Sequence, residues 1–383
     1  MKRYGFLILC LTLLGPSTVL AQDGHAMAIG NAATGAPMEA DGLYWNPALL
    51  ALPNPGTSTW TVTTGFSAFD TSNAGSPILK LNDNAVAVSS QDPFQRFQQY
   101  KSLFAVKYTN MAGGVLWDQQ LTTQSSLDAI RFFNDRNNGV LSPNNYNLDY
   151  NQTKQQIATL LVGYSMDLPL GSLPFFSVGG TLKYHDGLWY EKDQLIGGFQ
   201  QGSSNNSYQY TRTTSTDGLG LSVDAGFFAK FTDALQLAMM FQNIQSNFNW
   251  TAQQQTLSLD PNTGQEKVTG TQNVTVNANM PYAVKLGLTA APPDKNIVML
   301  GQVEWVNHQT NWNFGLERYY PDNSLAIRLG TFFDHYSNSQ MWCFGAGIDK
   351  PTFNVDLAFL TRSLPDIENS IALGGGLDIG IRF

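Results

Sequence analysis

The chain has 383 residues, of which only 13% are charged, and its formal net charge is −8. Soluble globular chains usually contain about 25% charged residues, so the low charge content needs an explanation. The acidic balance with scattered basic residues excludes broad nucleic-acid binding, which requires a clustered positive face. The 43% hydrophobic content excludes a disordered chain.

The first residues predict export from the cytoplasm. Lys2 and Arg3 precede an apolar stretch from Phe6 to Leu14, and Val19-Leu20-Ala21 has the pattern of a cleavage site. This arrangement is typical of a secretory signal peptide over residues 1–21, because the apolar stretch is shorter than the roughly 20 residues of a spanning helix. The mature chain then keeps one cysteine, Cys343, which cannot form an internal disulfide.

The remaining sequence alternates between apolar and polar residues with the period of a β-strand. No stretch after residue 21 has 18 consecutive apolar residues, so no spanning helix is expected. Strict alternation runs from Ile371 to Phe383, longer than the usual soluble strand. Similar segments predict fourteen strands, at 57–69, 101–109, 113–121, 156–168, 175–187, 219–231, 235–249, 282–290, 297–308, 311–319, 325–334, 341–349, 352–360 and 371–383. An even number of such segments is typical of a bacterial outer-membrane barrel.

The connections between these segments alternate in length. Short turns are expected at 110–112, 169–174, 232–234, 292–296, 321–323 and 350–351, and longer stretches at 70–100, 122–155, 188–218 and 250–281. Outer-membrane barrels have short periplasmic turns and long extracellular loops, which places both termini in the periplasm. The prediction is therefore an all-β fold, a 14-stranded antiparallel transmembrane β-barrel over residues 57–383. A large soluble β-sandwich or propeller is the structural alternative.

Aromatic residues near the expected strand ends support a membrane location. Tryptophan favours the headgroup level of a bilayer. The tryptophans concerned are Trp60, Trp117, Trp250, Trp305, Trp312 and Trp342.

The chain ends on a strand whose last residue is aromatic. Phe383 follows Ile381 and Ile379 on one face. This ending resembles the signal that the barrel assembly machinery recognises, although Asp378 stands where that signal usually has glycine. We expect these three residues to act as the assembly signal.

If the apolar strand faces meet lipid, the opposite faces line the lumen. The expected lumen charges are Lys107, Lys183, Lys230, Lys285, Arg328, Arg382, Asp118, Asp224, Glu304, Glu317, Asp356 and Asp378. Equal numbers of both signs argue against a strongly ion-selective pore, which uses a ring of one sign. They favour a hydrogen-bonded network that holds the wall and a plug together. A substrate path lined by specific charges is the functional alternative.

Residues 22–56 do not have the pattern of a strand. They are rich in alanine and glycine up to Ala36 and lead into Asn46-Pro47-Ala48. Small residues permit close packing, and Asn-Pro is a turn-forming pair. A barrel of about eight strands already fills with its own side chains, so a fourteen-stranded one is wide enough for a plug. We therefore expect an N-terminal hatch inside the barrel.

At this segment the sequence resembles a known family. The stretch from Ala26 to Ala32 and the run from Asp41 through Tyr44-Trp45 to Ala48 look like the N-terminal region of the FadL superfamily of outer-membrane proteins. The resemblance implies a fourteen-stranded barrel whose hatch carries the motif at Asn46, Pro47 and Ala48. It also implies passive uptake of long-chain fatty acids or other hydrophobic compounds, with movement of the hatch releasing the ligand.

Related barrels of the PorV type share a Tyr-Trp-Asn-Pro-Ala-like stretch and serve protein secretion. Tyr44 and Trp45 before the motif favour that branch, so a component of a protein secretion system is the alternative function. A general polar porin is a third. The expected partners are outer-membrane lipid, a hydrophobic small-molecule ligand and the barrel assembly machinery. If the alternative function holds, secreted proteins are partners as well.

Two segments in the long loops have helical spacing. Leu127, Ile130, Phe132 and Phe133 predict an amphipathic helix. It would either capture a ligand in a first hydrophobic groove or pack on the barrel rim. A second short helix is expected at 92–100.

Sequence motifs for catalysis or metal binding are absent. The four histidines, His25, His185, His308 and His335, are not paired at ligand spacing, and no catalytic motif occurs. The run from Asp260 to Glu266 is more consistent with a hairpin turn than with a calcium loop. We expect no enzyme, metal or cofactor, although a Ser–His pair assembled from distant strands stays open.

Overall fold

The computed structural model describes residues 23–36, 39–54, 58–72, 93–142, 145–171, 173–292, 296–306, 309–320, 324–334, 339–362 and 371–383. The expected signal peptide lies outside these residues, as do His308 and His335.

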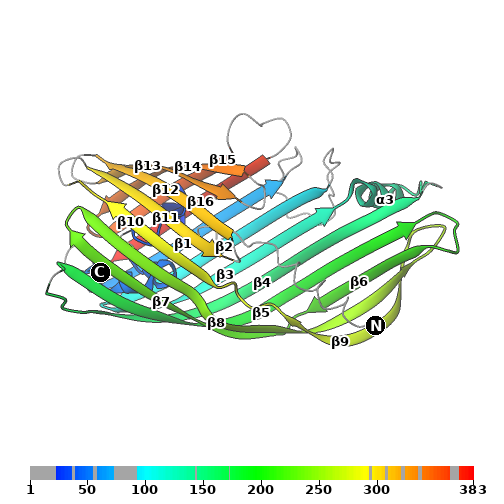
Figure 1. The fold of residues 1–383 in the computed structure, drawn as a ribbon, viewed down its shortest axis with the longest axis horizontal. Coiled ribbons are helices and arrows are strands. Elements are labelled where there is room, and N and C mark those ends of the chain that lie inside the picture. Colours follow the sequence, from blue (N-terminus) through cyan, green and yellow to red (C-terminus); the bar gives the residue numbers. More distant parts are fainter. Residues whose placement is uncertain are drawn as a thin grey trace.

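Antiparallel strands close into a barrel (Figure 1). Its first and last strands, β1 (Trp60–Ser72) and β16 (Ile371–Arg382), pair with each other from Thr61 opposite Arg382 to Ser72 opposite Ile371. The other strands of the ring are β2 (Phe94–Tyr108), β3 (Met111–Ser125), β4 (Tyr146–Asp167), β5 (Phe175–Phe199), β7 (Gly218–Thr232), β8 (Leu235–Leu259), β10 (Ala283–Ala290), β11 (Ile297–Val306), β12 (Gln309–Tyr319), β13 (Leu325–Asp334), β14 (Ser339–Lys350) and β15 (Phe353–Arg362). Within the described residues this ring has fourteen strands, which confirms the predicted fold class.

Two further strands are not among the fourteen predicted. β6 (Ser207–Ser215) and β9 (Glu266–Asn277) lie in stretches that were expected to be loops, at 188–218 and 250–281. β6 pairs with the outer parts of β5 and β8, and β9 pairs with β8. Both escaped prediction because their faces are mostly polar, and β9 is exposed along nearly its whole length. These strands extend the wall beyond the ring at the end that carries the long loops, here called the loop end.

The opposite end carries short connections and is here called the turn end. The C-terminus and the blue N-terminal segment lie toward this end in Figure 1. The hairpin expected at Asp260–Glu266 is present at the loop end, because β8 ends at Leu259 and β9 begins at Glu266.

The outer face of the barrel is apolar. Along β4, Leu160, Val162 and Tyr164 are exposed, whereas Leu161 and Ser165 between and after them are buried. Exposed outward apolar side chains recur on β1, β2, β3, β5, β7 and β10 to β16. The structure thus has the continuous lipid-compatible belt of a membrane barrel.

Five of the six tryptophans expected near strand ends point outward, although Trp117 lies in the middle of β3. Trp60, Trp117, Trp305, Trp312 and Trp342 are exposed on the outside. Trp250 is fully buried in the lumen, where it stacks on Tyr190 with ring centroids 5.3 Å apart. It packs over Gly187 and Gly218, which leave space for its indole ring.

Helices are few and short. The N-terminal segment forms α1 (Gly24–Ala28), α2 (Gly42–Trp45) and the 3₁₀ helix η1 (Pro47–Ala51), and α3 (Leu127–Asn137) follows β3. No helix in the described part of the chain is long and apolar enough to cross a membrane. The short helix expected at 92–100 is wrong: β2 begins at Phe94, and its long pairing with β3 overrides the local helical spacing.

Candidate functional site

The N-terminal segment fills the lumen as a compact plug. Met27, Ile29, Leu43, Trp45 and Leu49 are buried in one cluster with inward-facing residues of the wall. We call residues 23–54 of this segment the hatch. Its first arm, residues 23–36, contacts the wall from β16 round to β10. Its second arm, residues 39–54, contacts β7, β5, β4 and β2.

The motif Asn46-Pro47-Ala48 joins the two arms to each other and to the wall. The Asn46 side-chain oxygen accepts a hydrogen bond from the Ala48 N–H at 3.1 Å, which caps η1. The Asn46 side-chain nitrogen donates to the carbonyls of Thr34 and Phe227, both at 3.1 Å. Pro47 takes the first position of η1, where its missing N–H costs nothing.

The wall offers glycines where the hatch passes. A side-chain Cβ at Gly179 would lie 2.5 Å from the Pro47 backbone, and one at Gly315 would lie 2.8 Å from Ile29. At Gly330 a Cβ would overlap the backbone of Gly30. From β14 round to β4, the inward-facing glycines in close contact with the hatch are here called the glycine belt: Gly163, Gly179, Gly226, Gly287, Gly315, Gly330 and Gly345. Only glycine lets the hatch backbone approach the wall this closely.

Polar side chains of the wall satisfy backbone groups of the hatch. The hydroxyls of Ser177, Thr181 and Thr289 donate to the carbonyls of Ala48, Leu43 and Gly35 at 2.8–2.9 Å. The ammonium group of Lys107 donates to the Leu52 carbonyl at 2.8 Å. The described residues of the hatch have no sheet pairing, so these donors prevent buried carbonyls from being left without partners.

Lysine–carboxylate pairs surround the loop-end surface of the hatch. Lys183 lies 2.5 Å from Asp224, and Lys285 lies 3.3 Å from Glu304. Lys101, which sequence reasoning missed, is directly opposite Asp118 across β2 and β3.

The same lysines lie against the aromatic tip of the hatch. Lys101 and Lys183 lie 5.9 and 5.5 Å from the centre of the Tyr44 ring. Lys285 lies 5.3 Å from the centre of the Trp45 ring. Each cation thus has a carboxylate neighbour and an aromatic face, which fixes the tip of the hatch in a locally neutral layer.

An apolar cluster lies beyond this layer toward the loop end. Ile157, Tyr190, Phe248 and Trp250 are buried together in the lumen. Phe248 and Trp250 meet edge to face with centroids 5.2 Å apart.

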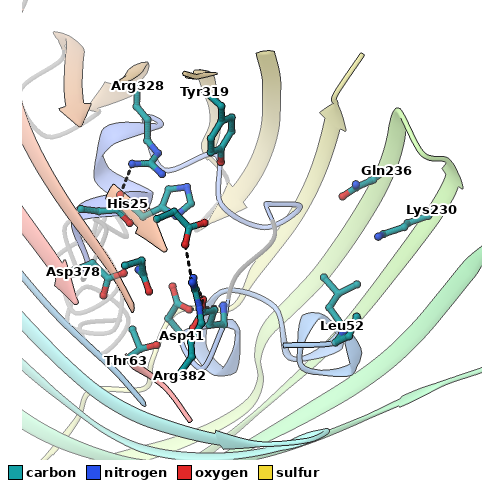
Figure 2. A pocket seen from close by; sticks show the side chains of 15 residues that line it. His25, Asp41, Leu52, Thr63, Lys230, Gln236, Tyr319, Arg328, Asp378 and Arg382 are labelled. Atoms are coloured by element: carbon teal, nitrogen blue, oxygen red, sulfur yellow. Dashed lines mark hydrogen bonds and ion pairs between the residues drawn. The ribbon is translucent and has the colours of Figure 1, made fainter. Parts of the chain in front are cut away.

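The turn-end side of the hatch borders a charged cavity of about 280 Å³, which we call the vestibule (Figure 2). Its charged lining residues are His25, Glu39, Asp41, Lys230, Arg328, Asp349, Asp356, Asp378 and Arg382. His25 lies 3.4 Å from Glu317, and Arg328 lies between Glu317, at 2.8 Å, and Asp356. Arg382 pairs with Glu39 of the hatch and with Asp349, the latter at 2.7 Å.

Burial changes the protonation of the hatch carboxyl groups. Burial, and next the nearby Asp23, raise the pKa of Asp41 to about 7. Burial also raises the pKa of Asp23, although its carboxylate accepts from the Trp45 indole at 2.8 Å and from the Ala26 N–H at 2.6 Å. Burial and Arg328 oppose the charged form of His25, but Glu317 and Asp356 outweigh them and raise its pKa.

The structure brings most of the expected lumen charges into pairs or into the vestibule. Lys183, Lys285, Glu304, Asp224, Glu317, Arg328, Asp356 and Arg382 form the ion pairs given above. Asp118 accepts hydrogen bonds from Gln99 and Gln120. Lys107 binds a hatch carbonyl, and Lys230 and Asp378 line the vestibule.

The hatch carboxylates were missed because nothing in the pattern of a short irregular segment shows which residues end up buried. The pairs Lys285–Glu304 and Lys101–Asp118 could have been found by aligning the predicted neighbouring strands, since the two residues of each pair are directly opposite each other across adjacent strands.

Helix α3 forms where helical spacing predicted it, capped by the Ser126 hydroxyl. Phe132, Phe133 and Ile130 are buried, and Leu127 is half-buried. Phe132 packs on Tyr146 and Phe199 with centroids 5.5 and 5.0 Å apart.

The position of α3 follows from the alternation in β4. Tyr146 shares its strand face with the outward-facing Leu160, because β3 and β4 pair without a register shift from Tyr150 to Tyr164. The helix therefore packs on the outer face of the wall extension. Its expected role in ligand capture stays a prediction.

A Ser–His contact does form in the lumen wall. The Ser222 hydroxyl lies 2.8 Å from His185 Nε2, and the Thr159 hydroxyl lies 2.9 Å from His185 Nδ1. In a hydrolytic triad a carboxylate usually orients the histidine. Here a threonine occupies that place, and all three side chains are buried in the wall.

The expected assembly residues close the barrel. Ile379 and Ile381 lie opposite Thr64 and Val62 of β1. The Phe383 carbonyl accepts hydrogen bonds from the N–H groups of Thr59 and Trp60 at 2.8 and 3.3 Å, and its side chain is exposed. Recognition of this end by the assembly machinery stays a prediction.

No protein-family model matches this sequence, and no curated protein sequence matches it. Solved structures do match over nearly the whole length. The Pseudomonas putida toluene transporter TodX matches with a TM-score of 0.62 and 10% identity, covering 94% of this chain and 97% of that one. The Ralstonia pickettii toluene transporter TbuX matches with a TM-score of 0.60 and 10% identity, covering 94% and 98%. A Pseudomonas aeruginosa FadL homologue matches with a TM-score of 0.60 and 11% identity, covering 96% and 99%.

The chain has the fold of a FadL-type barrel. At these identities the likeness concerns the fold alone, and it confirms the fourteen-stranded barrel fold that the resemblance implied. In this FadL-type barrel the motif has a clear structural task, because Asn46 links both arms of the hatch to β7.

Proposed function

We propose that this protein is an outer-membrane channel for passive uptake of small hydrophobic molecules. The apolar belt on the outside supports a location in a bilayer. The turn end then faces the periplasm and the loop end faces the outside. Solved barrels of the same fold are named as toluene transporters and as a monoaromatic hydrocarbon channel, which supports a transport role rather than catalysis.

The observation that carries the proposal is the plugged lumen. The buried core of the hatch fills the barrel, and its tip is held in a layer of paired charges. Such a lumen is unsuited to a water-filled polar pore, which disfavours the general porin. A solute that leaves water for the apolar cluster at Tyr190, Phe248 and Trp250 gains the free energy of removing its apolar surface from water.

Uptake into liposomes tests the proposal. Purified protein in vesicles should speed the entry of labelled toluene or a labelled long-chain fatty acid relative to empty vesicles. Entry of a small sugar should stay at the background rate. Which of the two apolar solutes enters faster would name the substrate class. Equal entry with and without protein for both solutes would overturn the channel function.

The secretion alternative rests on Tyr44 and Trp45. Both side chains are buried in the hatch, where they contact lumen lysines and Asp23. They therefore have a task inside the barrel, and we favour the channel.

A further inference from the structure

The hatch is held differently on the side that faces β15 and β16. From β14 round to β4 the hatch touches the glycine belt closely, with its backbone at Gly179, Gly315 and Gly330 and with side chains at Gly163, Gly226 and Gly345. At β15 and β16 this close approach is confined to Gly24, which lies against Gly376, and charged side chains of the hatch face the wall beside it. We call this boundary the acidic seam, formed by Asp23, His25, Glu39 and Asp41 of the hatch and by Asp356, Asp378 and Arg382 of the wall.

The acidic seam has more carboxylates than cations. Arg382 is engaged by Glu39 and Asp349, and Arg328 by Glu317 and Asp356. His25 lies beside Glu317. Lys107 donates to the Leu52 carbonyl and also attracts Glu39 and Asp41. Within the described residues no ion pair remains for Asp41 or Asp378.

One of these carboxylates is aimed into the vestibule without a partner. Asp378 lines the cavity and is 3% exposed, and its Oδ1 has no hydrogen-bond partner among the described residues. Asp378 is directly opposite Asp356 across β15 and β16 and also feels the negative charges of Asp41, Asp23 and Glu39. Two charged carboxylates at Asp41 and Asp378 would push the hatch away from the wall.

We propose that the hatch opens toward the turn end at the acidic seam, and that the charges on Asp41 and Asp378 decide whether the seam is closed or open. This inference rests on the proposed channel function, since it assigns the exit route and its control. The glycine-belt side of the hatch stays in place while the seam parts and joins the lumen to the vestibule.

The pH dependence follows from the raised pKa of Asp41. A carboxyl group whose pKa in the closed state exceeds its ordinary value stabilises the closed seam while it is protonated. For Asp41, this stabilisation of the closed seam is lost as pH rises through about 7. The ionised fraction of Asp41 rises about tenfold between pH 6 and pH 8 for a pKa of about 7. His25 acts in the same direction, because its charge beside Glu317 is also lost as pH rises. Alkaline conditions therefore open the seam.

Hydrogen exchange on the full-length protein in detergent tests the seam without any ligand. After correction for intrinsic exchange, peptides covering residues 39–45 should exchange several-fold faster at pH 8 than at pH 6. Asp41→Asn combined with Asp378→Asn imitates the protonated pair and should remove most of this difference, leaving only the smaller contribution of His25. Asp167→Asn, at an exposed carboxylate of the same barrel end, should keep it. A pH response of undiminished size in the double variant would overturn the proposal.

A disulfide on the belt side separates opening at the seam from departure of the whole hatch. A Cβ at Gly35 would lie 3.5 Å from that of Ala238 on β8, within the range for a disulfide. Vesicle uptake by the oxidised Gly35→Cys, Ala238→Cys variant should match uptake by its reduced form. Loss of uptake on oxidation, with recovery on reduction, would show that the whole hatch must move and would overturn the seam. Absence of uptake even by the unmodified protein would count against the channel function, while the exchange result would still decide the seam.

Discussion

The two sides of the hatch are attached to the barrel by different physical means. On the belt side, backbone lies against glycine at distances that no other residue allows, and this attachment depends on shape. On the seam side, buried charges hold hatch and wall together around a cavity, and this attachment depends on protonation. The difference teaches that a plug can be held in the barrel by close packing on one side and still respond to pH on the other.

Arg328→Met should have the largest effect, because it breaks the charged side. Removing the guanidinium leaves the buried carboxylates of Glu317 and Asp356 without their shared cation. Breaking a buried ion pair typically costs about 3–5 kcal/mol. Samples are heated to a series of temperatures before a denaturing gel, and the temperature at which the folded band disappears should fall strongly. Arg131→Met, which removes an exposed pair with Asp128, should cost less than about 1 kcal/mol; similar losses in both variants would contradict the charged attachment.

Gly330→Ala should have the next largest effect, on the belt side. The added Cβ would overlap the backbone of Gly30, so hatch or wall must shift. Overpacking of this kind typically costs about 1–3 kcal/mol. Gly113→Ala on β3 is the matched control, because its nearest neighbour would be the Leu161 carbonyl oxygen at 3.8 Å. Limited proteolysis of the hatch should increase only in the first variant, and equal protection in both would contradict a tight belt.

Asn46→Ala should weaken the join between the two arms. The substitution removes the cap on η1 and the donors to Thr34 and Phe227. Loss of a cap costs about 0.5–2 kcal/mol. Hydrogen exchange of the 46–52 segment should increase in this variant. Asn54→Ala, just beyond the hatch contacts, removes bonds only to Ser58 and Thr59 and should leave that segment protected.

His25→Gln should have the smallest effect, and one confined to acid. A histidine whose folded pKa is raised contributes stability that is fully present below its ordinary pKa of about 6.5 and is lost as pH rises through the folded value. The exchange difference between the variant and the unmodified protein should therefore be largest in acid and vanish in alkali. A difference that is independent of pH would assign His25 a packing role instead.

Much of the barrel could be predicted from the sequence, because lipid and lumen impose opposite demands on successive residues. The alternation from Ile371 to Phe383 gave β16 almost to the residue. β6 and β9 could not be predicted this way, since both of their faces are mostly polar. Trp250 was misplaced because β5 and β8 change register near Gly187 and Asn243, which a strict period of two does not anticipate.

The hatch shows where prediction from sequence ends. Asn46 could be named from its motif, but its partners Thr34 and Phe227 are set by how the arms fold back. A glycine within a strand, such as Gly330, reveals that something approaches closely without revealing what. The acidic seam depends on contacts between residues as far apart as Glu39 and Arg382, which no local pattern encodes.

The wide span of the hatch contacts has a consequence for how the chain is made. Glu39 pairs with Arg382, 343 positions later, and Gly24 lies against Gly376. The first segment to be synthesised therefore finds its final partners only after the last strand exists. Contacts of such long range form slowly. Docking of the hatch and closure of the barrel are thus one late event. In a chain that stops before β16, the first residues of the hatch have no wall to pack against.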